Sequence, residues 1–365
     1  MRFQQEYCAP DLVQGLAAAL DREAGGLTAP LRLMEVCGTH TMAIARFGLK
    51  SLLPPQIRLV SGPGCPVCVT PVGYLDHALA LAADPDHLVA TFGDLLRVPG
   101  SASSLMEQRA HGADVRVVWS ALDAVALAAR HPERRVIFLG VGFETTAPTV
   151  AAAILQAEQQ GLQNFFVLCG HKTMPQAMAL LSADPELPID GYLCPAHVST
   201  VVGARVYQPL AEQYGIPCVV TGFEAADLLQ GILLLVRQHL ERQARVEIQY
   251  RRAVSWQGNQ RAQLLLSQVF EPCDAEWRGL GTIAGSGLQL QERYSCFDAA
   301  RQLSVAVPAP REPDGCCCGK VLTGRIEPQD CPLFGTACQP ETPVGACMVS
   351  GEGSCAAAWR YGIQY

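Results

Sequence analysis

The sequence predicts an α/β protein in which two similar parallel-sheet domains face a cleft and a smaller cysteine-rich domain follows them. Short apolar runs alternate with Ala/Leu-rich segments as far as about residue 243. The length of 365 residues exceeds the size, about 250–300 residues, at which single cores stop growing. Seven of the 16 cysteines fall in the last fifty residues, among many Pro and Gly. Because 49% of the residues are hydrophobic and only 17% are charged, we expect a large buried core.

Each element follows from its local pattern. Residues 11–20 have the apolar spacing of an amphipathic helix. The apolar runs expected to form buried strands are 31–36, 57–60, 87–92, 115–119, 136–141, 165–168, 191–193 and 217–220. The segments expected to form helices between them are 74–83, 121–130, 148–160, 174–182 and 224–242. This alternation implies parallel sheets with helices on both faces.

The chain also resembles itself at a spacing of roughly 130 residues. The matching pairs, in order, are 37–40 with 169–172, 65–70 with 194–199, and 91–94 with 221–224. We therefore expect a duplicated α/β unit. Two such units facing each other would leave a cleft lined by strand ends, where open α/β sheets bind ligands.

Four regions are expected along the chain. Residues 1–30 would form a helix that packs on the C-terminal domain, and residues 31–160 a first α/β domain. Residues 161–243 would form the second α/β domain. Residues 244–365, where the composition changes, would form the cysteine-rich domain.

Composition excludes several classes of protein. The net charge of −7 and the lack of a basic stripe argue against nucleic-acid binding. The longest apolar stretches, such as 232–236, are too short to cross a bilayer, and Met1–Tyr7 lacks the apolar core of a signal peptide. We therefore expect a cytoplasmic protein without a membrane partner. Cysteines stay reduced there, so clustered cysteines favour metal or redox roles over structural disulfides.

Cys37 is the first candidate functional residue. It stands where an apolar strand should end and a helix begin, so we expect the helix dipole to increase its thiolate character. His40, three residues on, would share its face, and a thiolate beside an imidazole suits iron, zinc or copper. A buried cysteine before a capped helix is the alternative.

Cys65 and Cys68 form a C-x-x-C pair in the loop 62–68, which contains Gly-Pro-Gly. Such a pair closes a reversible disulfide or binds a metal. The alternative is a loop that merely contains two cysteines.

A third group of residues, Glu144, Thr145 and Thr146, follows the strand expected at 136–141. Glu144 would face the cleft at the carboxyl end of the strand, and either threonine would cap the next helix. An ordinary strand–turn–helix junction explains the same residues.

The C-terminal cysteines are candidate metal ligands. Their spacings of 13, 7, 9 and 8 residues fit neither a zinc ribbon nor a ferredoxin run. Four thiolates from this set would suffice for a [4Fe–4S] cluster, while zinc and no metal remain alternatives. The candidates are Cys318, Cys331, Cys338, Cys347 and Cys355.

Taken together, these motifs resemble the HypD family of hydrogenase maturation proteins. The resemblance spans nearly the whole chain, and its ordered motifs are far more specific together than singly. It rests on Cys-Gly-Thr-His at 37–40, Gly-Pro-Gly-Cys-Pro-Val-Cys at 62–68, Gly-Phe-Glu-Thr-Thr at 142–146, and the cysteine-containing segments 318–324, 330–335 and 347–355.

The resemblance implies a redox-active scaffold, rather than a conventional turnover enzyme, that helps to assemble the Fe(CN)₂CO unit of [NiFe]-hydrogenases. It implies a [4Fe–4S] cluster in the C-terminal domain, a small HypC-type chaperone as partner and a HypE-type protein as cyanide donor. The family's essential thiol falls on Cys37, which would bind iron, and its redox pair falls on Cys65 and Cys68. His40 would support the iron site or occasionally bind the metal. Glu144, Thr145 and Thr146 would orient the cyanides.

One departure from the family pattern concerns the cysteine run. The family commonly has Cys, another residue, Cys and Gly, whereas this chain has three consecutive cysteines, 316–318, before Gly319. Which four thiols bind a cluster is therefore left open. Two rival functions also stay open: a cluster-dependent disulfide reductase and a structural zinc protein that serves as a docking platform. A nucleotide-binding enzyme is disfavoured because no G-x-x-x-x-G-K-[ST] motif occurs.

Overall fold

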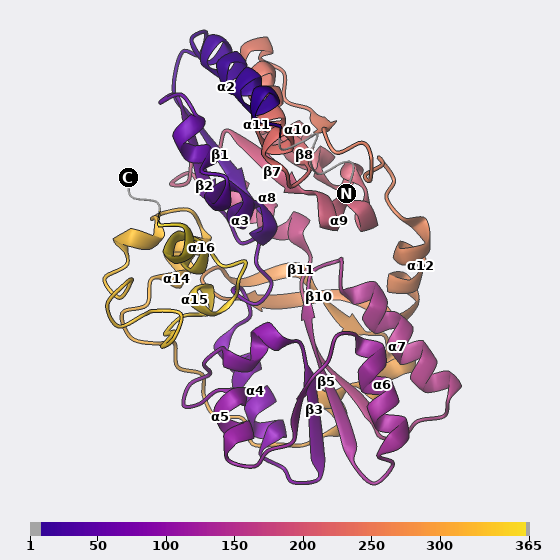
Figure 1. The fold of residues 1–365 in the computed structure, drawn as a ribbon. Coiled ribbons are helices and arrows are strands. Elements are labelled where there is room, and N and C mark those ends of the chain that lie inside the picture. The colour runs from indigo at the N-terminus through magenta and orange to yellow at the C-terminus, as the bar shows by residue number, and fades with distance from the viewer. Residues whose placement is uncertain (1–8, 363–365) are drawn as a thin grey trace.

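The computed structural model describes residues 9–362 and has two parallel sheets, one β-hairpin and a C-terminal segment of short helices (Figure 1). Residues 1–8, which include the Met1–Tyr7 segment and the start of the expected range 1–30, lie outside the described residues, as do 363–365. No helix within 9–362 is both long enough and apolar enough to span a membrane.

The strands are β1 (Leu31–Glu35), β2 (Ile57–Ser61), β3 (His87–Thr91), β4 (Val115–Val117), β5 (Arg135–Gly142), β6 (Phe165–His171), β7 (Gly191–Pro195), β8 (Cys218–Thr221), β9 (Val246–Ile248), β10 (Phe270–Trp277) and β11 (Gly281–Leu290). The helices are α2 (Pro10–Ala24), α3 (Gly38–Arg46), α4 (Val72–Ala82), α5 (Leu105–Ala110), α6 (Ala121–Arg130), α7 (Ala147–Gln159), α8 (Met174–Ser182), α9 (Ala196–Val202), α10 (Gln208–Tyr214), α11 (Ala225–Glu241), α12 (Gln260–Val269), α13 (Ala299–Gln302), α14 (Cys318–Leu322), α15 (Ala346–Val349) and α16 (Ser354–Tyr361).

The predicted fold class is confirmed. Sheet A has the strand order β2-β1-β7-β8-β9 and sheet B the order β4-β3-β5-β6, and every pairing within them is parallel. Strands such as β5, buried at every position after Arg135, are continuous apolar runs because helices cover both faces of the sheet.

The two sheets divide the chain differently from the expected ranges 31–160 and 161–243. Sheet A takes β1 and β2 from the first range and β7 to β9 from later in the chain, while sheet B takes β3 to β6. The chain therefore crosses between the domains after β2 and again after β6. Short apolar strands contain no signal for which sheet they join, so alternation alone could not place these crossings.

The internal resemblance at 130 residues does not match this division either. Segment 37–40 follows β1, and 65–70 lies in the loop after β2; both strands belong to sheet A. Their counterparts, 169–172 and 194–199, begin within the last residues of β6 of sheet B and β7 of sheet A. The two domains are similar in architecture, but the repeated motifs do not occupy equivalent places.

The N-terminal helix α2 packs on α11, on the outer face of sheet A, rather than on the cysteine-rich segment. Leu20 is fully buried there, and Glu23 pairs with Arg237 at 2.7 Å. The apolar face of α2 therefore completes the core of the first domain.

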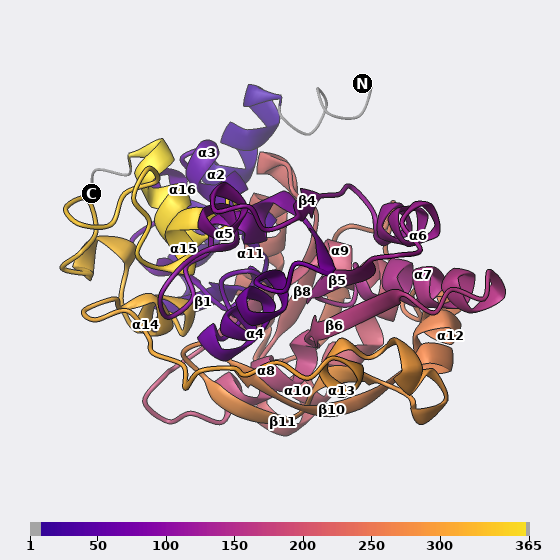
Figure 2. The same ribbon diagram turned by 90° about the horizontal axis from the view of Figure 1, so that it is seen from below.

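The antiparallel hairpin β10–β11 lies against β6 and α8 (Figure 2). Its backbone meets the end of β6 at Lys172 and Gly287. Trp277, at the end of β10, is 1% exposed and stacks on Phe143 with ring centroids 5.8 Å apart. The hairpin thus reaches the loop that follows β5.

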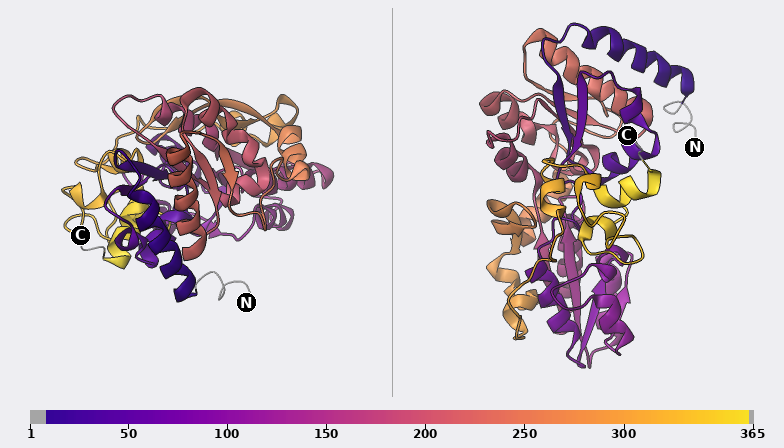
Figure 3. Two further views of the ribbon diagram at one scale, coloured as in Figure 1. Left: turned by 90° about the horizontal axis from the view of Figure 1, so that it is seen from above. Right: turned by 90° about the vertical axis from the view of Figure 1, so that its left-hand side faces the viewer.

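The C-terminal segment lies on one side of the molecule, at the level where the two domains meet (Figure 3). On the side of sheet A, its Glu352 carboxylate accepts a hydrogen bond of 2.7 Å from the hydroxyl of Thr39. On the side of sheet B, its Ser350 hydroxyl donates a hydrogen bond of 3.3 Å to the carboxylate of Asp94. Residues 316–362 therefore bridge the two domains.

Candidate functional site

Each sheet has one point at which its strand order reverses, and ligands of open α/β sheets bind at such points. In sheet A this point lies between β1 and β7, and in sheet B between β3 and β5. The carboxyl end of β1 leads to Cys37, that of β7 to His197, and that of β5 to the 142–146 motif. Sheet topology therefore explains why motifs far apart in sequence meet.

They meet around a pocket of about 310 Å³, which we call the Cys37 pocket. Its walls come from both sheets and from the C-terminal segment. The lining residues are Val36, Cys37, Thr39, Gly64, Pro66, Phe143, Thr145, Pro195, His197, Val198, Thr200, Val201 and Glu352.

Two glycines allow the backbone to close around Cys37. A Cβ at Gly64 would lie 2.2 Å from the Cys37 nitrogen, so only glycine lets the 62–68 loop approach so closely. Gly38 donates a backbone hydrogen bond of 3.0 Å to the Gly64 carbonyl. On its other side, a Cβ at Gly38 would lie 2.5 Å from the Cβ of Glu352. The glycines in these motifs therefore serve close packing between three segments.

Cys37 is the N-cap residue of α3 and is 6% exposed. The pKa of its thiol is raised to about 12, chiefly by burial and also by the carboxylates of Glu352 and Glu35. Hydrogen bonds from the backbone N–H groups of His40 and Thr39 lower this pKa, but the effect of burial is larger. The thiol is therefore neutral near pH 7, contrary to the expected thiolate character, because loss of solvation exceeds the helix dipole.

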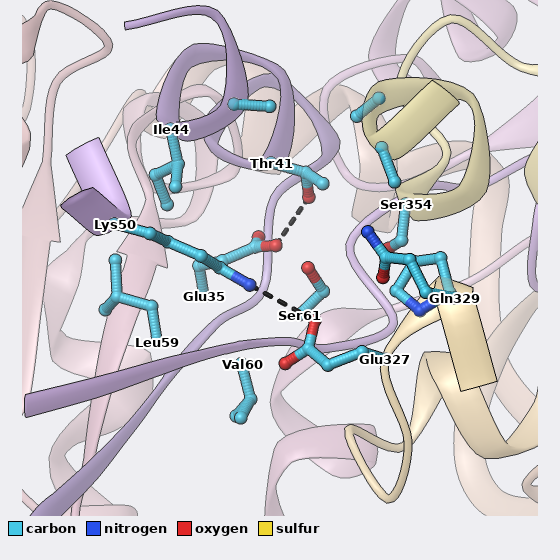
Figure 4. Close-up of a pocket in the computed structure, with 14 residues that line it drawn as sticks. Glu35, Thr41, Ile44, Lys50, Leu59, Val60, Ser61, Glu327, Gln329 and Ser354 are labelled. Atoms are coloured by element: carbon cyan, nitrogen blue, oxygen red, sulfur yellow. Dashed lines mark hydrogen bonds and ion pairs between the residues drawn. The ribbon is translucent and has the colours of Figure 1, made fainter. Parts of the chain in front are cut away.

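Glu35 holds the turn that presents Cys37. One carboxylate oxygen accepts the Cys37 backbone N–H at 3.1 Å, and the other accepts the Thr41 hydroxyl at 2.5 Å. Burial raises the pKa of Glu35 to about 8. Figure 4 shows this carboxylate pointing toward Thr41 in a small cavity of about 30 Å³, with the Lys50–Glu327 ion pair across it.

The structure does not bring the His40 ring into the Cys37 pocket. The ring is fully buried, and its Nε2 lies 3.2 Å from both the carbonyl and the hydroxyl oxygen of Thr221. Burial lowers the pKa of His40 to about 4, so the ring is neutral. The backbone N–H of His40, rather than its imidazole, lowers the pKa of Cys37. His197, which follows β7, lines the pocket instead.

The three polar residues of the 142–146 motif lie in different surroundings. Thr145 is exposed and lines the Cys37 pocket, whereas Thr146 occupies the N-cap of α7 without a side-chain capping bond. Glu144 is 3% exposed, and one of its oxygens accepts the Met174 backbone N–H at 2.9 Å. Burial raises the pKa of Glu144 to about 7. Glu144 thus fixes the start of α8 from behind the pocket.

Cys65 and Cys68 form a disulfide in the loop after β2, and Cys65 directly follows Gly64, which packs on the backbone of Cys37. Both are buried, and Cys68 Sγ lies 3.9 Å from the carbonyl oxygen of Ala346. Ala346 precedes Cys347, so the disulfide touches the cysteine-rich segment. Cys65 and Cys68 also share one apolar core with Cys318 and Cys347.

Six cysteines surround a second, apolar pocket, which we call the thiol pocket. They are Cys316, Cys318, Cys331, Cys338, Cys347 and Cys355. Val321, Leu333, Phe334 and Met348 shield them. Cys317 faces a different, open pocket. The structure therefore adds Cys316 to the five candidates from the sequence, because the turn at 316–318 directs alternate thiols inward.

The chemistry of these donors fits an iron–sulfur cluster, which takes four thiolates. Hydrogen bonds from Cys316 and Cys347 lower the pKa of Cys318 well below its ordinary value. Within 9–362, no three His, Cys, Asp or Glu side chains are placed to hold a single metal ion. The thiol pocket measures about 10 Å³, and Cys318 Sγ lies 2.7 Å from Cys347 Sγ, so a cluster would have to separate these thiols.

Reasoning from sequence missed two residues that the site contains. Glu352 sits in the quoted 347–355 segment, and a lone charge between two glycines was the available signal. Arg278 lies in a turn with no motif, and no sequence pattern indicated its burial.

Comparisons with known proteins identify chains similar to this one over nearly its whole length. The family model for HypD, described as the hydrogenase formation hypA family, matches residues 11–362. The hydrogenase maturation factor HypD of Rhodobacter capsulatus is 47% identical over 99% of this chain and 98% of its own length. HypD of Escherichia coli is 46% identical over 99% of this chain and 98% of its own length. The hydrogenase expression/formation protein HupD of Azotobacter chroococcum is 46% identical over 100% of this chain and 98% of its own length.

Proposed function

The chain belongs to the HypD family of hydrogenase maturation factors, and we propose that it is a redox-active scaffold for assembly of the Fe(CN)₂CO unit of a [NiFe]-hydrogenase. One observation carries the proposal: three thiol sites form a continuous series. Gly38, next to Cys37, donates its backbone N–H to the carbonyl of Gly64, which precedes the Cys65–Cys68 disulfide. The disulfide in turn contacts the segment of the thiol pocket at Ala346.

In this proposal Cys37 binds the iron, which is the substrate, together with a thiolate from a HypC-type chaperone. The Cys37 pocket provides the space for both at the junction of the two sheets. Because the thiol is neutral before binding, coordination releases its proton, as metal binding to cysteine generally does. Glu352, whose carboxylate lines the pocket, is positioned to receive that proton.

Cys65 and Cys68 serve as the two-electron store. Opening their disulfide takes up two electrons and two protons and gives two thiols. A [4Fe–4S] cluster, held by four cysteines of the thiol pocket, supplies electrons singly when bound. Because Cys68 contacts Ala346, the disulfide lies close to the segment that contributes Cys347 to the thiol pocket.

The cyanides would come from a HypE-type protein docked over the Cys37 pocket. Thr145 is the residue of the 142–146 motif that lines the pocket, so its hydroxyl is the donor we assign to a cyanide nitrogen. Glu144 holds the start of α8, Thr146 stands at the N-cap of α7, and His40 supports α3 from the core. We place this activity in the cytoplasm, where structural disulfides are rare and a disulfide such as Cys65–Cys68 is usually a catalytic or redox-sensing one.

The decisive experiment is infrared spectroscopy of the anaerobically purified complex with its chaperone. We expect cyanide and carbonyl bands in the native protein and their loss in Cys37→Ala. Cys218→Ala, which removes another buried free cysteine on β8, is the matched control and keeps the bands. Bands of full intensity in Cys37→Ala would remove this residue from the iron site.

A disulfide reductase is the second candidate, because the Cys65–Cys68 disulfide directly contacts the cysteine-rich segment. Catalytic turnover of a protein disulfide without any hydrogenase partner would favour it. Zinc in place of iron and sulfide in the anaerobic protein would instead favour a structural docking protein.

A further inference from the structure

Arg278 lies between the two cysteine groups, in the turn that joins β10 to β11. Its backbone N–H donates to the Val69 carbonyl at 2.9 Å, immediately after Cys68. The next residue, Gly279, has a φ of +80°, and a Cβ there would lie 2.3 Å from the Cα of Gly319. The turn is therefore pressed between the C-x-x-C loop and α14, which begins at Cys318.

The guanidinium is buried but poorly neutralised. Arg278 is 4% exposed, and its Nε and Nη2 atoms have no hydrogen-bond partner within the described chain. The carboxylate of Glu312 lies 3.7 Å from Nε, beyond hydrogen-bond distance, on a side chain that is 60% exposed. Buried charges in proteins are normally paired and hydrogen-bonded, so this site is short of negative charge.

The thiol pocket is where negative charge would arise. The turn that carries Arg278 packs on Gly319 through Gly279, and the residue before Gly319 is Cys318, which lines the thiol pocket. A cluster with four thiolates is an anion, and each electron that it accepts adds one more negative charge. In a buried region this charge interacts with a nearby cation far more strongly than it would in water.

We propose that Arg278 is the buried cation that sets the reduction potential of the iron–sulfur cluster in the thiol pocket, with Glu312 moderating its charge. This inference rests on the proposed function, because it requires the cluster. The step concerned is the addition of one electron from a low-potential reductant, with no bond formed or broken. By stabilising the more negative state, Arg278 raises the potential.

The test is an anaerobic potentiometric titration with dithionite, followed by visible and electron paramagnetic resonance spectra, with iron and sulfide assays. Arg278→Gln should lower the midpoint potential by at least about 59 mV, which is a tenfold change for one electron. Arg278→Lys keeps the charge and should remain close to the native value. Glu312→Gln should shift the potential upward.

Arg237→Gln is the matched control, since it removes the same charge from α11 on the outer face of sheet A, and it should leave the potential unchanged. If Arg278→Gln retains its iron and its potential equals that of Arg237→Gln, Arg278 has only a packing role and the inference is wrong. Should Arg278→Gln fail to fold, the Glu312→Gln shift decides, and no upward shift overturns the inference. Absence of iron and sulfide from the native chain would instead contradict the proposed function.

Discussion

The hydroxyl of Thr39 donates a hydrogen bond of 2.7 Å to the carboxylate of Glu352, although 313 residues separate them in the chain. This bond ties the cysteine-rich segment to the helix that begins next to Cys37. It also holds a carboxylate over the Cys37 pocket. The position of the segment, and hence of its thiols, therefore depends on the first domain.

The Thr39–Glu352 bond should govern how firmly the C-terminal segment docks. Thr39→Val removes a hydrogen bond to a charged acceptor, and such bonds contribute about 1.5–3 kcal/mol. We expect faster backbone hydrogen exchange across residues 346–362. Thr200→Val is the control, because Thr200 lines the same pocket but within residues 9–362 its hydroxyl bonds to its own helix, at the His197 carbonyl. Equal exchange in both variants would show that the bond does not hold the segment.

The close approach at Gly64 should not tolerate any side chain. In Gly64→Ala the methyl group would meet the backbone of Cys37 at 2.2 Å, so we expect destabilisation of about 3 kcal/mol or more in urea unfolding. Gly15→Ala makes the same change within α2, where nothing lies within 4 Å, and should stabilise by about 0.5–1 kcal/mol. If both variants keep native stability, the loop is not packed on Cys37 as described.

Glu144 should make stability depend on pH. Its pKa rises from 4.5 to about 7 on folding, so between these values the folded chain keeps a proton that the unfolded chain releases. Stability must therefore fall as pH rises through this window, by on the order of 3 kcal/mol in total. Glu144→Gln removes the titration but keeps an oxygen for the Met174 N–H.

Urea unfolding of both proteins at several pH values checks this expectation. The stability of Glu144→Gln relative to the native chain should increase from pH 4.5 to 7 and stay constant above that range. A difference that does not vary with pH would mean that Glu144 is ionised in the folded protein.

Much of the fold could be predicted because strands buried on both faces leave a strong local pattern. Every apolar run interpreted as a strand forms one, from β1 at 31–35 to β8 at 218–221. What the pattern lacks is partner information. It could not show that β7 pairs with β1 across 155 intervening residues (36–190), and so the expected ranges do not follow the distribution of strands between the two sheets.

The same distinction explains the candidate site. Cys37, Cys65 and Thr145 could be found because their residue types are chemically distinctive within short motifs, and the structure brings all three to one region. His40 is the contrasting case, since helical spacing predicted a shared face with Cys37 but tertiary packing turns its ring toward Thr221. Arg278 could not be found, because what distinguishes it is burial, which no local pattern at that turn indicates.

The geometry of the cysteine run predicts which thiol is dispensable. Cys316 and Cys318 line the thiol pocket, while Cys317 faces the open pocket beside Lys320. Cys317→Ser should therefore retain the full iron and sulfide content, whereas Cys318→Ser should lose most of both. Serine keeps the size of the side chain, so the contrast reports loss of a thiolate donor rather than of packing. Iron and sulfide assays on anaerobically purified chains measure this directly, and equal loss in both variants would place Cys317 among the ligands.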